Sequence, residues 1–397
     1  MKNNKSSKYS QLIVLSLTGA LIAGAALMLT ALGNPGNMGM CAACFIRDIA
    51  GALGLHHNTL LQYARPEVIG VILGAFALTI ASRIPKSSLR RKLGGGAAIK
   101  GGSAPLTRFA LGATMMIGAL IFLGCPLRML LRMAGGDLNA FIGLFGFVAG
   151  ILAGLFFIKR GFSLGKNYEQ KLAESVHPPA AALILLALLV FVPSLLLFSA
   201  EGPGSMHAPL GVALLAGLAV GALSFFSRFC IVGAFRDSFL LKKIAPTLIA
   251  VLVLLIVATL GNVILGNFNL GFENQPVAHS EFVWNFLGLA LVGLSAVLVS
   301  GCPMRQLVLA GTGSSNATLT VVGMVAGAAL AHNFQIAASP AGLSINGIIG
   351  LIVAFAITLA IAAAYTFMSK RECGNSDAQK QNLTGTETTT GLCAQDD

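Results

Sequence analysis

Two stretches of the sequence each place a thiol, a proline and a guanidinium side by side at the end of an apolar run. They are Gly124-Cys125-Pro126-x-Arg128 and Gly301-Cys302-Pro303-x-Arg305. Proline is favoured at the first position of a helix, because its missing N–H would have no partner there. We therefore expect each cysteine to be the N-cap residue of a short helix that a flexible glycine precedes.

A helix that starts in this way can attract anions. Its first N–H groups have no partner and carry a partial positive charge, and the arginine two positions after the proline adds a full one. A neutral thiol at the tip is a weak donor and a weak acceptor, so it can contact an anion without holding it. A thiol beside arginine at a helix N-terminus can also ionise, and it would then repel anions and act as a nucleophile. Both alternatives stay open.

These motifs recur in the same order along the chain. Cys41-x5-Arg47-Asp48 returns 189 positions later as Cys230-x5-Arg236-Asp237. The two Gly-Cys-Pro motifs are 177 positions apart, and so are Gly136-x-x-Asn139-Ala140 and Gly313-x-x-Asn316-Ala317. The pattern predicts an internal duplication. A buried cysteine is often only a small hydrophobic residue, but the duplication favours a functional role for Cys41, Cys125, Cys230 and Cys302.

The other polar residues of the motifs have two interpretations. Charges inside a membrane are costly and usually functional. Arg47-Asp48 and Arg236-Asp237 can therefore contact a substrate, or they can clamp a loop in place. We expect Asn139 and Asn316 to cap the spans that follow them, and His332 to be a packing residue.

Cys41-x-x-Cys44, with His56 and His57 downstream, resembles a metal or redox motif only in part. Zinc-finger spacing and a thioredoxin-like context are both absent, so we expect no metal and no cofactor.

The composition is that of a membrane protein. Of 397 residues 56% are hydrophobic and only 10% are charged, and 47 are glycine. Apolar runs of about twenty residues, enough to cross a bilayer, recur along the chain. We expect an all-α polytopic protein with about ten spans, at 11–33, 66–84, 106–124, 138–158, 179–200, 209–226, 246–266, 282–301, 317–337 and 343–367. Four shorter segments, each with cysteine and arginine, are expected to be re-entrant: 38–55, 125–136, 227–241 and 302–316.

Charge predicts the orientation of these spans. The net charge of +12 comes largely from loops such as Arg83 to Arg108, whereas the loop from Asn267 to Glu281 contains no lysine or arginine. This alternation follows the positive-inside rule and does not indicate nucleic-acid binding. Lys2, Lys5 and Lys8 place the N-terminus inside, and we expect both termini in the cytoplasm.

On this count the second repeat is inverted relative to the first, as in many transporters. We expect a first repeat at 1–178, an inverting linker helix at 179–208, a second repeat at 209–340 and a last span at 341–368. The tail at 369–397, which includes Cys373 and Cys393, is polar and expected to be disordered.

At these motifs the chain resembles the YeeE/YedE sulfur-transport family. The resemblance rests on "GNMGMCAACFIRD", "LGCPLRMLLRMAGGDLNA", "SRFCIVGAFRD" and "SGCPMRQL", which begin at Gly36, Leu123, Ser227 and Ser300. The first two stretches look most like a branch associated with selenium metabolism, whose members are described as selenium transporters. Better-understood relatives take up thiosulfate through an hourglass-like fold.

The resemblance implies a role for each thiol. Cys125, Cys230 and Cys302 would form a central relay that contacts the anion in turn, with Cys41 or Cys44 at the outer mouth. It also implies the bacterial inner membrane as the location and a small TusA-like sulfur-carrier protein as a cytoplasmic partner.

Three functions remain open from the sequence. The first is a transporter for a small sulfur- or selenium-containing anion such as thiosulfate, which does not itself use ATP because no P-loop is present. The second is a membrane thiol enzyme that relays sulfur or selenium as a covalent cysteine adduct. The third is a membrane scaffold in which the cysteines only pack. We expect the first, and therefore not an enzyme.

Overall fold

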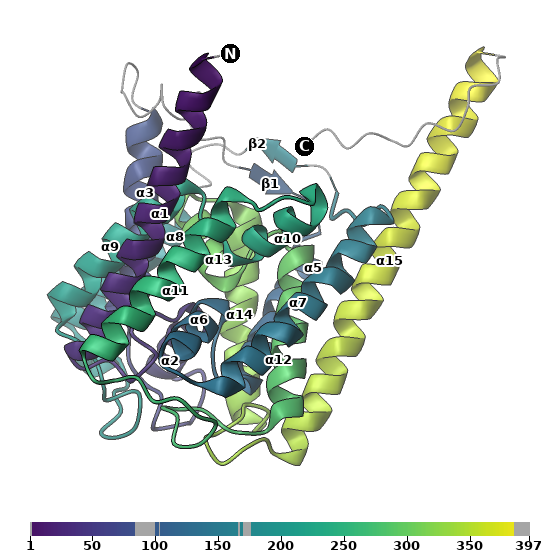
Figure 1. Ribbon diagram of the computed structural model, residues 1–397. Coiled ribbons are helices and arrows are strands. Elements are labelled where there is room, and N and C mark those ends of the chain that lie inside the picture. The colour runs from purple at the N-terminus through teal and green to yellow at the C-terminus, as the bar shows by residue number, and fades with distance from the viewer. Residues whose placement is uncertain (1, 84–99, 103, 166, 170–175, 385–397) are drawn as a thin grey trace.

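The protein is built almost entirely of helices (Figure 1). The computed structural model describes residues 2–83, 100–102, 104–165, 167–169 and 176–384. The longer helices are α1 (Lys2–Ala31), α3 (Pro66–Arg83), α5 (Pro105–Ile121), α7 (Leu138–Lys159), α8 (His177–Phe191), α9 (Leu210–Ser227), α11 (Pro246–Ile264), α12 (Phe282–Leu298), α14 (Ser315–Asn333) and α15 (Ile345–Thr384). The shorter ones are α2 (Ala42–Ala52), α6 (Pro126–Ala134), α10 (Ile231–Leu241), α13 (Pro303–Gly311) and the 3-10 turn η2 (Pro193–Leu195).

Eight helical stretches of the described chain are long and apolar enough to cross a membrane. They are Gln11–Ala31, Pro66–Arg83, Pro105–Ala134, Leu138–Lys159, Leu210–Leu241, Pro246–Ile264, Phe282–Gly311 and Ile345–Met368. Three of these stretches run from a long helix into the short helix that follows it. The expected class, an all-α polytopic membrane protein, is confirmed.

Two of the ten predicted spans are not among these eight. The span predicted at 179–200 corresponds to α8, which has only 15 residues. Proline cannot continue a helix, so Pro193 ends it early and begins η2. The span predicted at 317–337 corresponds to α14, which has 19 residues but a less apolar sequence with Thr318, Thr320 and His332.

Each predicted re-entrant segment contains one short helix that follows a non-helical turn. After α5, Leu123 adopts a left-handed conformation with φ 63°, and after α12 Ser300 does the same with φ 62°. Cys125 and Cys302 are then extended, with ψ of 172° and 166°, because the proline that follows excludes the helical conformation. The left-handed residue and the proline together explain why the chain turns here and starts a new helix.

The helices pack in corresponding pairs. The closest partners are α1 with α11, α3 with α9, α5 with α14 and α7 with α12. Helices α1, α3, α5 and α7 correspond in order to α9, α11, α12 and α14. When each helix is replaced by its counterpart, the pair of α1 with α11 becomes the pair of α9 with α3, and the pair of α5 with α14 becomes the pair of α12 with α7. A duplicated chain with pseudo-twofold symmetry would give this pattern.

The connection between the two halves brings the chain to the face where α2 ends. Leu197 donates a backbone hydrogen bond to Ala52 and Ser199 donates one to Gln62. At the opposite face β1 (Lys100–Gly102), before α5, pairs with β2 (Asn167–Glu169), after α7. In Figure 1 this second face also carries α10, the N-terminal end of α1 and the C-terminal end of α15. Helices α2 and α6 lie nearer the first face.

The last helix extends into the polar tail. α15 continues to Thr384, past residue 369, from which the sequence predicts disorder. An established helix propagates at little cost, and residues 369–384 contain no proline and several good helix formers. The rest of the tail, including Cys393, and the basic loop at 84–99 lie outside the described residues.

Glycine allows the paired helices to touch backbone to backbone. A Cβ atom at Gly221 of α9 would lie 2.2 Å from the carbonyl oxygen of Val71 in α3, and one at Gly217 would lie 2.2 Å from that of Glu67. Helix association in lipid depends on such close packing, because there is no hydrophobic force between helices there. By contrast, a Cβ at Gly211 of the same helix would meet no atom within 4 Å.

This contrast predicts the stability of two alanine variants. Gly221→Ala should lower the free energy of unfolding by about 1–3 kcal/mol, since the methyl group forces α9 away from α3. Gly211→Ala should leave it unchanged or raise it by at most about 1 kcal/mol. Melting temperatures of the detergent-solubilised variants measure the difference. Equal melting temperatures would contradict the close packing of α3 on α9.

Candidate functional site

All four short helices start at a cysteine. Cys41, Cys125, Cys230 and Cys302 are the N-cap residues of α2, α6, α10 and α13. The sequence predicted this position for Cys125 and Cys302 from the proline that follows each. At the other two helices the thiol itself caps the helix: Cys41 Sγ accepts from the amide of Cys44 at 3.3 Å, and Cys230 Sγ accepts from that of Gly233 at 3.4 Å.

The four cap thiols form two close pairs. Cys41 Sγ lies 3.7 Å from Cys125 Sγ, and Cys230 Sγ lies 4.0 Å from Cys302 Sγ. Each pair joins the N-termini of two short helices of one half of the chain. None of the four is more than 9% exposed, so both pairs are buried. The structure thus brings together, within each half, the thiols that the sequence singled out.

Arg128 extends from the first pair to the surrounding loops. Its side chain is fully buried and donates to the carbonyl oxygens of Asn37, Leu123, Pro276 and Val277. Its Nη1 atom lies 3.7 Å from the Cys44 thiol. Within the described residues no carboxylate forms an ion pair with it. A buried guanidinium bonded only to neutral groups is a candidate site for an anion.

Arg305 occupies the corresponding place in the second half. It is partly exposed, and its Nη1 atom donates to the carbonyl oxygen of Ser224 at 3.4 Å. Like Arg128, it forms no ion pair with a carboxylate of the described chain.

The glycine before each of these cysteines has a structural role other than the expected flexibility. A Cβ at Gly124 would lie 2.8 Å from Cδ of Arg128, and one at Gly301 would lie 3.0 Å from Cγ of Arg305. Each arginine side chain therefore folds back over its glycine, and a Cβ atom at that position would crowd it.

The first Arg-Asp pair is a structural clamp. Asp48 accepts from Arg47 with one carboxylate oxygen and from Arg65 with the other, at 2.8 Å and 2.7 Å. Arg65 in turn donates to the carbonyl oxygens of Pro203 and Met206. All three charged side chains are buried. The clamp ties α2 to the loop before α3 and to the connection between the halves.

The second Arg-Asp pair lacks this third member. Arg236 and Asp237 bond at 2.8 Å, and their side chains are 29% and 37% exposed. Arg65 directly precedes Pro66 at the start of α3, and the residue that directly precedes Pro246 at the start of α11, the counterpart of α3, is Ala245. This pair therefore remains available to solvent and to other molecules.

The expectation that Asn139 and Asn316 cap their helices is wrong. Each is the second residue of its helix, and the caps are Asp137 and Ser314. Asp137 accepts from the amide of Asn139 at 2.9 Å and also pairs with Arg132 at 2.6 Å. At α7 the charged carboxylate of Asp137 also interacts favourably with the partial positive charge of the helix start, which an amide oxygen does less well.

The loop between α11 and α12 lies against the end of α6. Backbone hydrogen bonds join Asn269 to Gly135 and Leu138 to Gly271. His279, which is buried, is fixed by a 2.8 Å hydrogen bond between its Nε2 atom and the carbonyl oxygen of Ile121, and its Nδ1 atom accepts from the amide of Glu281. These contacts hold Pro276 and Val277, and their carbonyl groups, against Arg128.

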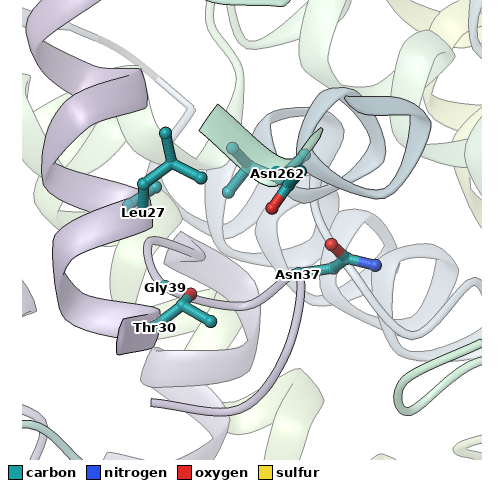
Figure 2. Close-up of a pocket in the computed structure, with 7 residues that line it drawn as sticks. Leu27, Thr30, Asn37, Gly39 and Asn262 are labelled. Carbon is teal, nitrogen blue, oxygen red and sulfur yellow. The ribbon is translucent and has the colours of Figure 1, made fainter. Parts of the chain in front are cut away.

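A small hollow lies beside this assembly. Figure 2 shows Leu27 and Thr30 of α1, Asn262 of α11 and the loop residues Asn37 and Gly39 around it. A Cβ at Gly39 would lie 1.9 Å from the carbonyl oxygen of Ala26, so glycine is required for the loop to approach α1. The hollow is lined by three uncharged polar side chains, and it adjoins Asn37, whose carbonyl oxygen binds Arg128.

Sequence reasoning missed several polar residues around the first pair. They are Arg65, Arg132, Asp137 and the buried Glu67, which accepts from Asn34 at 2.8 Å. One signal was available: Asp137 directly before an apolar helical run is typical of an N-cap. For Arg65 no local pattern exists, since its partners lie 17 and about 140 positions away.

Neutralising the first clamp should destabilise the protein far more than neutralising the second. Asp48→Asn leaves two buried guanidinium groups without a counter-charge, which costs about 3–5 kcal/mol. Asp237→Asn breaks an exposed pair, worth at most about 1 kcal/mol. Melting in detergent measures both. A similar loss of stability in the two variants would mean that the first clamp does not stabilise the fold more than the second Arg-Asp pair does.

The stability of the loop around His279 should depend on pH. Burial lowers the pKa of His279 below its ordinary value, which is about 6.5. The unfolded chain therefore binds a proton first as the pH falls. The stability contributed by neutral His279 is present above about pH 6.5 and is lost as the pH falls below it. The melting temperature of the wild type should drop more between pH 7.5 and 5.5 than that of His279→Gln, and equal drops would contradict this role.

The comparisons with known proteins point to sulfur transport. A family model described as sulphur transport matches residues 226–392, a range that contains Cys230, Arg236, Cys302 and Arg305. No curated protein matches the chain. The family match supports the resemblance found in the motifs, and it supports a sulfur-related transporter embedded in the membrane.

Proposed function

We propose that the protein is a transporter that moves a small sulfur- or selenium-containing anion across the membrane along its thiol pairs. The observation that carries the proposal is the repeated arrangement of two N-cap thiols beside an arginine that pairs with no carboxylate of the described chain. In a protein interior this arrangement offers positive potential and weak donors to an anion, with no counter-ion to displace.

The chemistry of the pairs suits passage of an anion and disfavours retention. The free N–H groups of two helix starts and one guanidinium attract the anion to each pair. The thiols form only weak hydrogen bonds, so each contact is easily exchanged for the next. An anion that enters a pair replaces the contact between the two sulfur atoms, and the sulfur atoms of the pair meet again behind it.

The four paired cysteines are buried, and so is Cys44. The proposed path is therefore closed in this conformation. Transport therefore requires the two helix starts of each pair to separate. The exposed Arg236–Asp237 pair allows such movement in the second half more readily than the buried clamp does in the first.

The orientation and partners follow from charge and from the family resemblance. We propose that the first pair faces the outside of the bacterial inner membrane and the second pair the cytoplasm, with both termini in the cytoplasm. A TusA-like sulfur carrier would then receive the product at the second pair. In agreement with this, the outer ends of α1 and α15 project from one face (Figure 1).

One observation favours a second candidate function. Cys44 lies 3.7 Å from the guanidinium of Arg128, and a cationic neighbour favours the thiolate form, which is a nucleophile. The Cys44 thiolate would then attack the outer sulfur of thiosulfate, the S–S bond of thiosulfate would break, sulfite would leave, and Cys44 would carry a persulfide for transfer. Mass spectrometry of the intact protein after exposure to thiosulfate distinguishes the two functions, because only the enzyme accumulates a persulfide.

Uptake into proteoliposomes tests the transporter. Cys125→Ala, Cys230→Ala and Cys302→Ala should each reduce the uptake of labelled thiosulfate or selenite at least about tenfold, which corresponds to 1.4 kcal/mol or more. The matched control is Cys393→Ala in the tail, which should transport like the wild type. Unchanged uptake in all three variants would refute the thiol path. A panel of thiosulfate, sulfite, selenite and selenate identifies the substrate.

A further inference from the structure

The two halves of the chain differ at one position of their thiol sites. Cys44 follows the cap residue Cys41 by three positions, and Gly233 follows Cys230 by the same number. The amides of both residues donate to the cap thiol. The backbone is therefore equivalent at the two positions, and only the side chain differs.

In the first half the side chain at this position is a thiol that lies beside the arginine. Cys41 Sγ lies 3.7 Å from Cys125 Sγ and accepts from the backbone amide of Cys44. Cys44 Sγ lies 3.7 Å from Nη1 of Arg128 and 3.9 Å from the carbonyl oxygen of Leu123. We call Cys41, Cys44, Cys125 and Arg128 the first-half cluster. It contains three thiols and a fully buried cation, with Cys41 in contact with Cys125 and Cys44 in contact with Arg128.

In the second half nothing occupies the equivalent place. A Cβ at Gly233 would lie 3.4 Å from Cβ of Cys230, 3.8 Å from its Sγ atom and 4.0 Å from a carboxylate oxygen of Asp237. These are ordinary contact distances, so a Cβ atom would fit there without displacing its neighbours. The second-half cluster, Cys230, Cys302 and Arg305, has two thiols and a partly exposed cation.

We propose that Cys44 makes the first-half cluster the tighter of two binding subsites for a sulfur-bearing anion, and that Gly233 makes the second-half cluster the weaker one. The inference rests on the proposed transport function and adds an asymmetry to it. An anion at the first subsite can accept from one more thiol, which donates to the carbonyl oxygen of Leu123 in this structure and which Arg128 holds in place. The charge of the anion is less screened there because the arginine is fully buried. The weaker subsite favours release.

The asymmetry can be tested by exchanging the two residues. The three variants are Cys44→Gly, Gly233→Cys and the double exchange, each made in a background with Cys373→Ser and Cys393→Ser. Thiosulfate transport is measured in proteoliposomes of known orientation, and a KM is determined for entry from each face. One added or lost hydrogen bond to a charged group should change the KM about five- to tenfold.

The wild type should have the lower KM for entry at the face of α2 and α6. Cys44→Gly should raise that KM and leave the other within about twofold, and Gly233→Cys should lower the KM for the opposite face. The double exchange should reverse the order of the two KM values. A structural defect would reduce the maximal rate from both faces and would not reverse the order. Cys44→Ser, which keeps a donor and most of the side-chain volume, should recover part of the loss.

The outcomes separate this inference from the proposed function. If Cys125→Ala abolishes transport but the exchange leaves the ratio of the two KM values unchanged, the asymmetry is refuted and the transporter stands. If Cys125→Ala transports normally, the thiol path itself is refuted. If Cys44→Gly fails to fold, Gly233→Cys decides alone, and an unaltered KM in that variant refutes the inference.

Discussion

The free backbone groups at the starts of four short helices constrain the rest of this structure. Inside a membrane protein an N–H group without a partner costs several kcal/mol, so each start must be satisfied locally or aimed at a polar path. Two starts use the cap thiol as acceptor, at Cys41 and Cys230, and two use proline, at Pro126 and Pro303. Because starts of the two kinds meet within each half, every meeting point contains two sulfur atoms and several free donors.

The surroundings of the two meeting points are very different. In the first half Asp48 pairs with two arginines, Asp137 pairs with Arg132, and a loop from the other half closes over α6. Within residues 209–384, the described part of the second half, a single Arg-Asp pair is present, and it is partly exposed. The sequence motifs are thus more alike in the two halves than the ion pairs around them. A buried ion-pair network holds its members in one geometry, whereas an exposed pair does so only weakly.

Sequence reasoning gave the membrane class, the duplicated motifs and the helices that begin after Cys125 and Cys302, because each depends on a local and periodic pattern. It placed full spans at 179–200 and 317–337, where Pro193 and a less apolar composition gave α8 and α14. It chose Asn139 as a cap, although Asp137, two positions earlier, competes for the same amides.

Other features had no local signal. The pairing of Cys41 with Cys125 joins positions 84 apart, and Arg65 reaches the carbonyl groups of residues far along the chain. Such contacts depend on how the helices pack, and the packing depends in turn on where glycine lets backbones touch. The repeat predicted which thiols correspond to each other across the halves. It did not predict that each thiol would meet its neighbour in the same half.

The segment that joins the halves is fastened to the first of them. Arg65 binds the carbonyl groups of Pro203 and Met206, and Asn34 accepts from the amide of Ala208 just before α9. A displacement of α2 therefore pulls on the beginning of the second half through a few short, buried bonds. If transport requires each thiol pair to open, as proposed, the opening of one pair would therefore affect the opening of the other.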